Sequence, residues 1–163
     1  MAKFREQTRS KNRGGNQIVR VTQPVLLVED SKSVAAFLKS EIEKKWGCDV
    51  HVAATYEQAK ELLKQYRHDY HLVICDLNLP DAPNGEIVDL VDLAKLKSIV
   101  LTGKFGDEFR ETMTQKRVVD YTLKQNTNSF GYVVDQVGRL FRNRVIHVMV
   151  VEDSTVARSM LTK

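Results

Sequence analysis

A short apolar run that ends abruptly in an acid, residues 72–75 followed by Asp76, places the strongest constraint on how this chain can fold. An uninterrupted run of this length suits a strand that is buried on both faces of a parallel sheet. Asp76 then lies at the carboxyl end of that strand. Ligands bind at this edge of open α/β sheets, because the loops separate there where the strand order reverses. Many strand-end aspartates only cap the next helix, so the role of Asp76 depends on what other strands bring to the same edge.

Four more segments are expected to form strands: 25–28, 48–54, 98–101 and 118–123. Ser31 is expected to cap the first helix and Gly47 to end it. Thr55 and Gln58 resemble a capping box at the start of the second helix.

Three further helices are expected between and after the remaining strands. The third follows Gly85, the fourth includes Phe109 and Met113, and the fifth carries a regular apolar stripe over residues 130–141. Five strands alternating with five helices predict an α/β fold. Its parallel sheet would be linked by right-handed crossovers and covered on both faces.

The length of 163 residues suits one domain with appendages. No stretch approaches the roughly 18 apolar residues of a membrane span, and the amino-terminal residues lack the apolar core of a signal peptide. A soluble, cytoplasmic protein is therefore expected. Cys48 and Cys75 lie in or beside predicted strands, and we expect buried, reduced thiols rather than a disulfide or metal ligands.

Positive charge is concentrated in an amino-terminal arm, residues 1–23. The arm has six basic residues against one acid, Glu6, and carries +5, whereas the rest of the chain carries −1. Because the arm is rich in Gln, Asn and Gly and has little apolar content, it is expected to be a disordered leader. Binding to nucleic acid or a membrane surface is the alternative. Phe4 is the arm's only aromatic residue for stacking, so neither is expected among the partners.

Three carboxylates, a hydroxyl and an amine follow the predicted strands: Glu29, Asp30, Asp76, Thr102 and Lys124. Each alone has an ordinary structural explanation, but parallel strands bring their ends to one edge. Carboxylates crowded there repel, by roughly 4 kcal/mol for two charges about 4 Å apart at an effective dielectric near 20, so the cluster needs a cation. Oxygen ligands in an open, hydrated site favour Mg²⁺. With a hydroxyl and an ammonium beside it, the set could hold a phosphoryl group during transfer to a carboxylate.

The order of these strand-end residues resembles the receiver domain of two-component response regulators, over residues 24–143. The resemblance implies a flavodoxin-like (βα)₅ fold with strand order 2-1-3-4-5. It implies that Asp76 accepts a phosphoryl group from the phosphohistidine of a sensor histidine kinase or phosphotransfer protein. Thr102 and Lys124 would bind the phosphoryl oxygens. The domain would be a phosphoacceptor rather than an enzyme, with at most self-phosphorylation and self-dephosphorylation.

The resemblance also implies the metal ligands and a switch. Mg²⁺, or Mn²⁺ in its place, would be bound by four groups: Glu29, Asp30, Asp76 and the backbone carbonyl of Asn78. Tyr121 matches the aromatic residue whose rotation reports phosphorylation. The fourth helix, fifth strand and fifth helix would form the responding face, which also allows a homodimer.

The chain departs from the family pattern in three places. Gln125 replaces the proline that usually follows the lysine, which puts the expected cis peptide bond in doubt. Gly85 lies one position later than usual, because residues 81–83 lengthen the loop after Asp76. The third helix looks short.

Residues 148–154 repeat the sequence pattern of residues 25–31 at an offset of 123 residues, which is one receiver domain. Residues 144–163 are therefore expected to begin a second receiver, in a fragment of a tandem-receiver protein. This segment is expected to be frayed or to pair with another chain's sheet edge. The expected downstream partners are this second receiver and an output domain, with a diguanylate cyclase as the first hypothesis and a DNA-binding or kinase domain as alternatives.

Three other functions fit parts of the pattern. A haloacid-dehalogenase-type phosphatase also uses a strand-end Asp with Thr and Lys, but its acidic pair follows the lysine, and Asn78 stands where its second aspartate would be. A flavodoxin-like cofactor binder needs a phosphate loop after the first strand, where this chain has two acids. A receiver-like interaction module that is never phosphorylated is the more serious alternative, because Gln125 is unusual.

Overall fold

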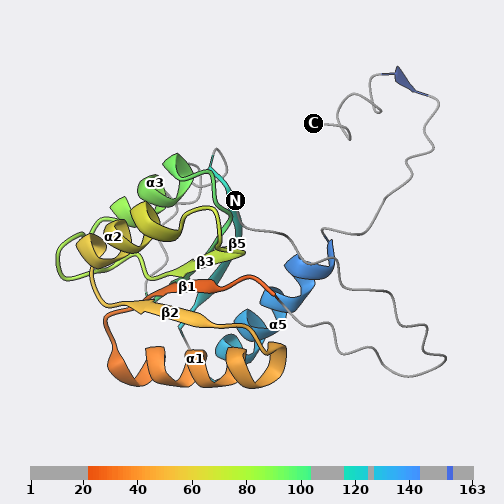
Figure 1. The fold of residues 1–163 in the computed structure, drawn as a ribbon, viewed down its shortest axis with the longest axis horizontal. Helices are drawn as coiled ribbons and strands as arrows, with labels where there is room; N and C mark the ends of the chain where they lie inside the picture. The colour runs from red at the N-terminus through yellow and green to blue at the C-terminus, as the bar shows by residue number, and fades with distance from the viewer. Residues whose placement is uncertain (1–21, 104–115, 125–126, 144–153, 156–163) are drawn as a thin grey trace, which may run out of the picture.

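A parallel sheet forms the centre of the computed structural model, which describes residues 22–103, 116–124, 127–143 and 154–155 (Figure 1). The strands are β1 (Val25–Val28), β2 (Val50–Ala53), β3 (Leu72–Cys75), β4 (Ser98–Thr102) and β5 (Val118–Leu123). They lie in the order β2-β1-β3-β4-β5, and each neighbouring pair is parallel. The predicted flavodoxin-like fold and strand order are confirmed.

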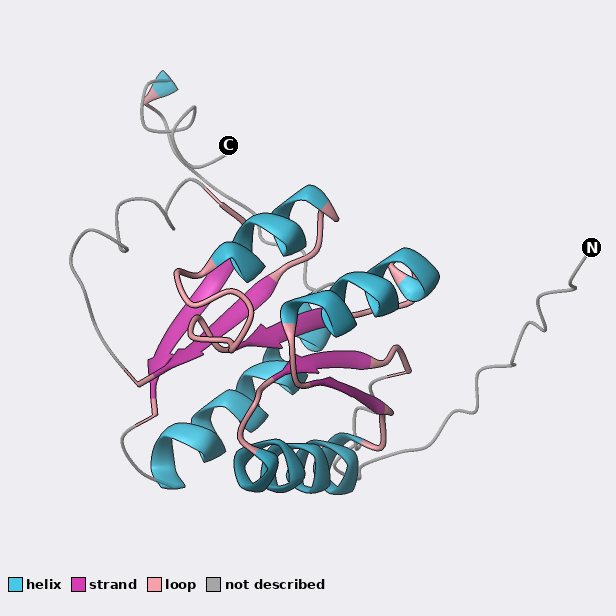
Figure 2. Cartoon of the chain, turned by 90° about the vertical axis from the view of Figure 1, so that its left-hand side faces the viewer, coloured by secondary structure: helices cyan, strands magenta, loops and turns pink. Residues whose placement is uncertain are grey.

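Helices cover both faces of the sheet, as the turned view shows (Figure 2). They are α1 (Lys32–Trp46), α2 (Tyr56–Tyr66), α3 (Glu86–Leu93) and α5 (Thr127–Asn143). One apolar layer joins α1 and α5 to strand residues such as Leu27 and Ile74, and the other joins α2 and α3 to Leu26 and Val73. Successive strand residues enter opposite layers, so β1 and β3 are buried throughout and hold the sheet edge in place.

The predicted helix ends are confirmed in part. Gly47 ends α1 with a φ of 67°, a left-handed conformation that glycine adopts without steric cost. Thr55 caps α2, because its hydroxyl accepts a hydrogen bond from the Gln58 backbone N–H at 3.2 Å, and the Gln58 side chain accepts one from Ala54. Ser31 occupies the position before α1, but its hydroxyl caps no helix amide; it lies 3.1 Å from the Ser33 hydroxyl instead.

Element boundaries differ slightly from the predicted ones. β2 is shorter than residues 48–54, because Cys48 and Asp49 connect it to α1 and the Ala54 amide donates to Gln58 rather than to the sheet. The short third helix is confirmed as the eight-residue α3.

Several predictions fall outside the described residues. They are the helix with Phe109 and Met113, the arm up to residue 21, Gln125, and residues 144–153 with the repeat. Among the helices that are described, none is both long and apolar enough to cross a membrane.

Candidate functional site

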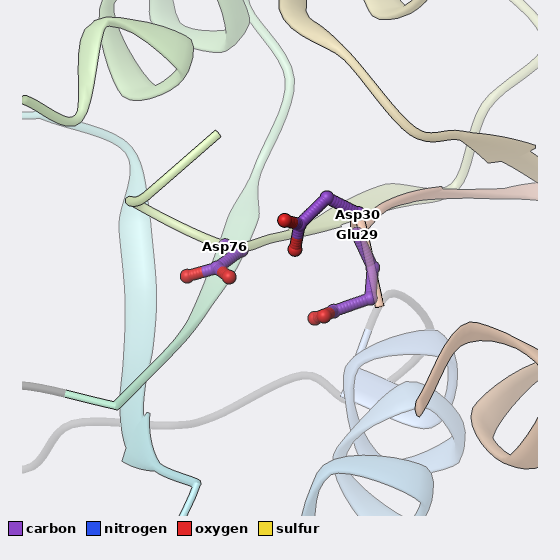
Figure 3. Close-up of side chains that lie close together, drawn as sticks. All are labelled: Glu29, Asp30 and Asp76. Carbon is purple, nitrogen blue, oxygen red and sulfur yellow. The ribbon is translucent and has the colours of Figure 1, made fainter. Parts of the chain in front are cut away.

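Three carboxylates meet at the carboxyl edge of the sheet because β1 and β3 are neighbours in register. Val28 pairs with Cys75, and the Asp76 N–H donates to the Val28 carbonyl at 2.9 Å. The residues that follow these strands, Glu29, Asp30 and Asp76, therefore lie side by side (Figure 3). Each offers an oxygen atom within 4.8 Å of the oxygens of the other two.

The three carboxylates differ in exposure. Glu29 is only 1% exposed and Asp76 6% exposed, whereas Asp30 is open to solvent. Backbone amides fix the buried pair: Ser31 N–H donates to Glu29 Oε1 and Asn78 N–H donates to Asp76 Oδ1, both at 3.2 Å. The site is thus held rigidly on its inner side and is accessible at Asp30.

Lys124, directly after β5, brings the positive charge. Its Nζ donates a hydrogen bond to Asp76 Oδ2 at 2.6 Å. The same Nζ lies 2.6 Å from Glu29 Oε2 and forms an ion pair with it, but the angles there do not suit a hydrogen bond. The Lys124 N–H donates to the Thr102 carbonyl at 2.8 Å, which ties the base of this side chain to the end of β4.

The electrostatics reflect this crowding. Burial raises the pKa of Glu29, and attraction to Lys124 offsets the effect only in part. Desolvation works against the ammonium, but the hydrogen bond that it donates to Asp76 and the charge attraction of Asp76 and Glu29 outweigh this effect and raise the pKa of Lys124. When all four groups are ionised, three carboxylates and one ammonium leave two negative charges uncompensated.

These residues fit a divalent cation. Glu29 Oε2 is buried with the Lys124 ammonium as its ion-pair partner, and oxygen atoms of all three acids converge beside it. Carboxylate oxygens with solvent access on one side are the ligand type that Mg²⁺ and Mn²⁺ accept. A divalent ion would also neutralise the two excess charges.

Of the remaining predicted site residues, Thr102 and Asn78 lie at the same edge, whereas Tyr121 lies within β5. Thr102 ends β4 and is 3% exposed, and Tyr121 lies in β5 opposite Val100. Tyr121 is half-buried against the layer formed by α2 and α3, and this burial raises the pKa of its hydroxyl. Asn78 is exposed in the loop after Asp76. The structure therefore brings Glu29, Asp30, Asp76 and Lys124 together. Asn78 and Thr102 adjoin them through backbone hydrogen bonds, and Tyr121 lies further back in β5.

Sequence reasoning missed Asp81, because the sequence predicts only a longer loop at this position. Its carboxylate accepts hydrogen bonds from the backbone N–H groups of Tyr56 and Glu57, at 2.8 and 3.1 Å. The available signal was an acid on a loop at the same sheet edge as the start of α2, where unpaired amides attract negative charge.

A family model described as the response regulator receiver domain matches residues 25–130. The cell cycle response regulator CtrA of Brucella ovis is 31% identical over 86 residues, which are 52% of this chain and 36% of CtrA. A crystal structure described as a two-component system response regulator/ggdef domain protein superposes with a TM-score of 0.76 at 33% identity, over 85% of this chain and 56% of that one.

The fold is also shared with smaller domains. The Francisella response regulator 1452 receiver domain gives a TM-score of 0.65 at 21% identity, over 76% of this chain and 99% of that one. By contrast, the chain spans about a third of CtrA and about half of the GGDEF-containing structure. The strand order, the acid cluster and the family match all indicate the same kind of domain. The chain belongs to the response regulator receiver domain family.

Proposed function

We propose that this receiver domain accepts a phosphoryl group on Asp76 from the phosphohistidine of a sensor histidine kinase or phosphotransfer protein. The observation that carries the proposal is the position of Asp76. It lies among two other carboxylates, with the Lys124 ammonium 2.6 Å from Asp76 Oδ2.

In the transfer step, an Asp76 carboxylate oxygen attacks phosphorus and forms the P–O bond of an acyl phosphate. The P–N bond to the donor histidine breaks, and its electron pair stays on the imidazole. Lys124 then binds a phosphoryl oxygen instead of Asp76 Oδ2. The Thr102 hydroxyl donates a hydrogen bond to another phosphoryl oxygen. Glu29, Asp30, Asp76 and the Asn78 carbonyl would hold Mg²⁺ or Mn²⁺. A bound divalent ion supplies the positive charge that lets an anionic phosphoryl group approach this acidic site.

The same residues suggest how phosphorylation is reported. The acyl phosphate adds up to about two negative charges, which attract Thr102 and Lys124 inward. Movement of Thr102 gives Tyr121, on the neighbouring strand, space to turn inward. β5 and α5 then shift as one face, which also serves for a homodimer. Switching from 1:99 to 99:1 needs about 5.5 kcal/mol of differential stabilisation.

The output of the full-length protein is part of the proposal. The repeat of residues 25–31 at 148–154 supports a second receiver beginning near residue 144. Similarity to a response regulator/ggdef domain protein supports a downstream diguanylate cyclase that makes cyclic-di-GMP. A cytoplasmic location belongs to the same proposal, because the product is a soluble nucleotide.

A second candidate is a receiver-like interaction module that is never phosphorylated. Gln125 favours it, because family members usually have proline after the lysine. Such a module would bind its partner equally well with Asp76 or Asn at that position.

Reaction with acetyl phosphate in Mg²⁺ separates the two functions. The wild type and Asp69→Asn, a matched change at an exposed site remote from the cluster, are expected to gain the mass of one phosphoryl group. Asp76→Asn is expected to gain none. Equal labelling of Asp76→Asn would refute Asp76 as the acceptor, and no labelling of the wild type would favour the interaction module.

A further inference from the structure

Asp81 joins two segments at the rim of the acid cluster. It belongs to the loop between β3 and α3, yet its two carboxylate oxygens accept hydrogen bonds from the first two amides of α2. We infer that Asp81 is a positioning residue for the metal site, acting through the loop that carries Asn78. This inference rests on the proposed metal-dependent function.

The start of α2 has a specific need for this carboxylate. The first amides of a helix have no partner within the helix, and the helix dipole favours a negative charge beside them. Thr55 satisfies the Gln58 amide, and Asp81 satisfies those of Tyr56 and Glu57. The hydrogen bond from Tyr56 lowers the pKa of Asp81, so the side chain is ionised at neutral pH.

The rest of the loop is already braced on its inner side. Leu79 and Ala82 exchange backbone hydrogen bonds at 3.3 and 3.2 Å, and Gly85 N–H donates to the Leu77 carbonyl at 3.0 Å. The side chains of Leu77, Leu79 and Ala82 are buried in the layer of α2 and α3. Asp81 adds a tie to a separate element, α2.

Asn78 lies between the acceptor Asp76 and the tie at Asp81. Its N–H donates to Asp76 Oδ1, so a shift of the loop moves both the proposed carbonyl ligand and a hydrogen bond of the acceptor. Residues that orient metal ligands without touching the metal typically change affinity 10- to 100-fold when replaced. Because burial still braces the loop, we expect the low end, about tenfold weaker Mg²⁺ binding in Asp81→Ala.

The test is calorimetric titration of the purified chain with MgCl₂ alone. Asp81→Asn is expected to bind with intermediate affinity, because its single carbonyl oxygen can serve one of the two amides. Glu61→Gln is the matched control: it removes a negative charge from α2 at an exposed ion pair with Lys64 and should bind like the wild type. A phosphorylation assay should show a raised half-saturating Mg²⁺ concentration at an unchanged maximal rate.

Hydrogen exchange without metal provides a second measurement. The amides of Tyr56 and Glu57 should exchange faster in Asp81→Ala than in Glu61→Gln. Unchanged Mg²⁺ affinity in Asp81→Ala, with normal binding by the wild type, would overturn the positioning role alone. No Mg²⁺ binding by the wild type would overturn the proposed metal site together with it.

Discussion

Replacing Gly138 by Ala should destabilise the domain, although alanine is normally the better helix former. Gly138 lies in α5 against the indole of Trp46, and a Cβ atom there would come closer than 3.0 Å to three ring carbons. The indole cannot move freely, because Trp46 Nε1 donates to the Val134 carbonyl at 2.6 Å and the ring is buried between α1 and α5.

The magnitude follows from three contributions. Overpacking a core typically costs about 1–3 kcal/mol, and a displaced indole loses a hydrogen bond worth about 1 kcal/mol. Alanine regains about 1 kcal/mol of helix propensity over glycine. The free energy of unfolding should therefore fall by about 1–3 kcal/mol.

Urea unfolding followed by the fluorescence of Trp46, the single tryptophan of the chain, measures this change. The midpoint should fall by about 1 M for a change near 2 kcal/mol. Gly131→Ala is the control: the same substitution in the same helix has nothing within 4 Å of the new Cβ and should raise stability by up to about 1 kcal/mol. A Gly138→Ala variant as stable as Gly131→Ala would refute the packing argument.

Three further predictions concern the described residues. Lys95 lies just after α3 with a φ of 59°, so Lys95→Gly should raise the free energy of unfolding by up to about 1 kcal/mol in urea titrations; a loss of stability would contradict this. Burial raises the pKa of Cys48 to about 11 and of Cys75 to about 12, so iodoacetamide at neutral pH should modify both thiols only on unfolding. Rapid labelling of the folded protein would contradict it. Burial also raises the pKa of Glu29, and the carboxylate must be ionised to bind metal, so Mg²⁺ affinity should fall as the pH is lowered through the Glu29 pKa and level off above it. An affinity independent of pH over this range would exclude Glu29 as a ligand.

The parts of the fold that depend on local sequence could be predicted. Uninterrupted apolar runs identified β1 and β3, and the polar residue after each run identified the sheet edge that carries the candidate site. Glu29, Asp30 and Asp76 could be grouped because parallel neighbouring strands end at one edge.

The parts that depend on three-dimensional packing could not be predicted. The sequence places Lys124 at the same edge as the acids, but not its direct ion pairs with both Glu29 and Asp76. Those pairs depend on sheet twist and on the conformation of the lysine side chain, which reaches past the end of β4. The Asp81 tie to α2 depends on the path of a loop, and sequence spacing does not specify that path. The prediction that the Ser31 side chain caps α1 was wrong, because its hydroxyl lies beside the Ser33 hydroxyl rather than over the first helix amides.

We propose that the acid cluster is a divalent-cation site that directs a phosphoryl group to one carboxylate. The most direct measurement is the location of the phosphoryl group by mass spectrometry of peptides, after reaction of the wild-type chain with acetyl phosphate with and without Mg²⁺. We expect one phosphoryl group per chain, on Asp76, and only when Mg²⁺ is present. Phosphorylation of another residue, or equal labelling of Asp76 after removal of divalent ions with EDTA, would contradict it.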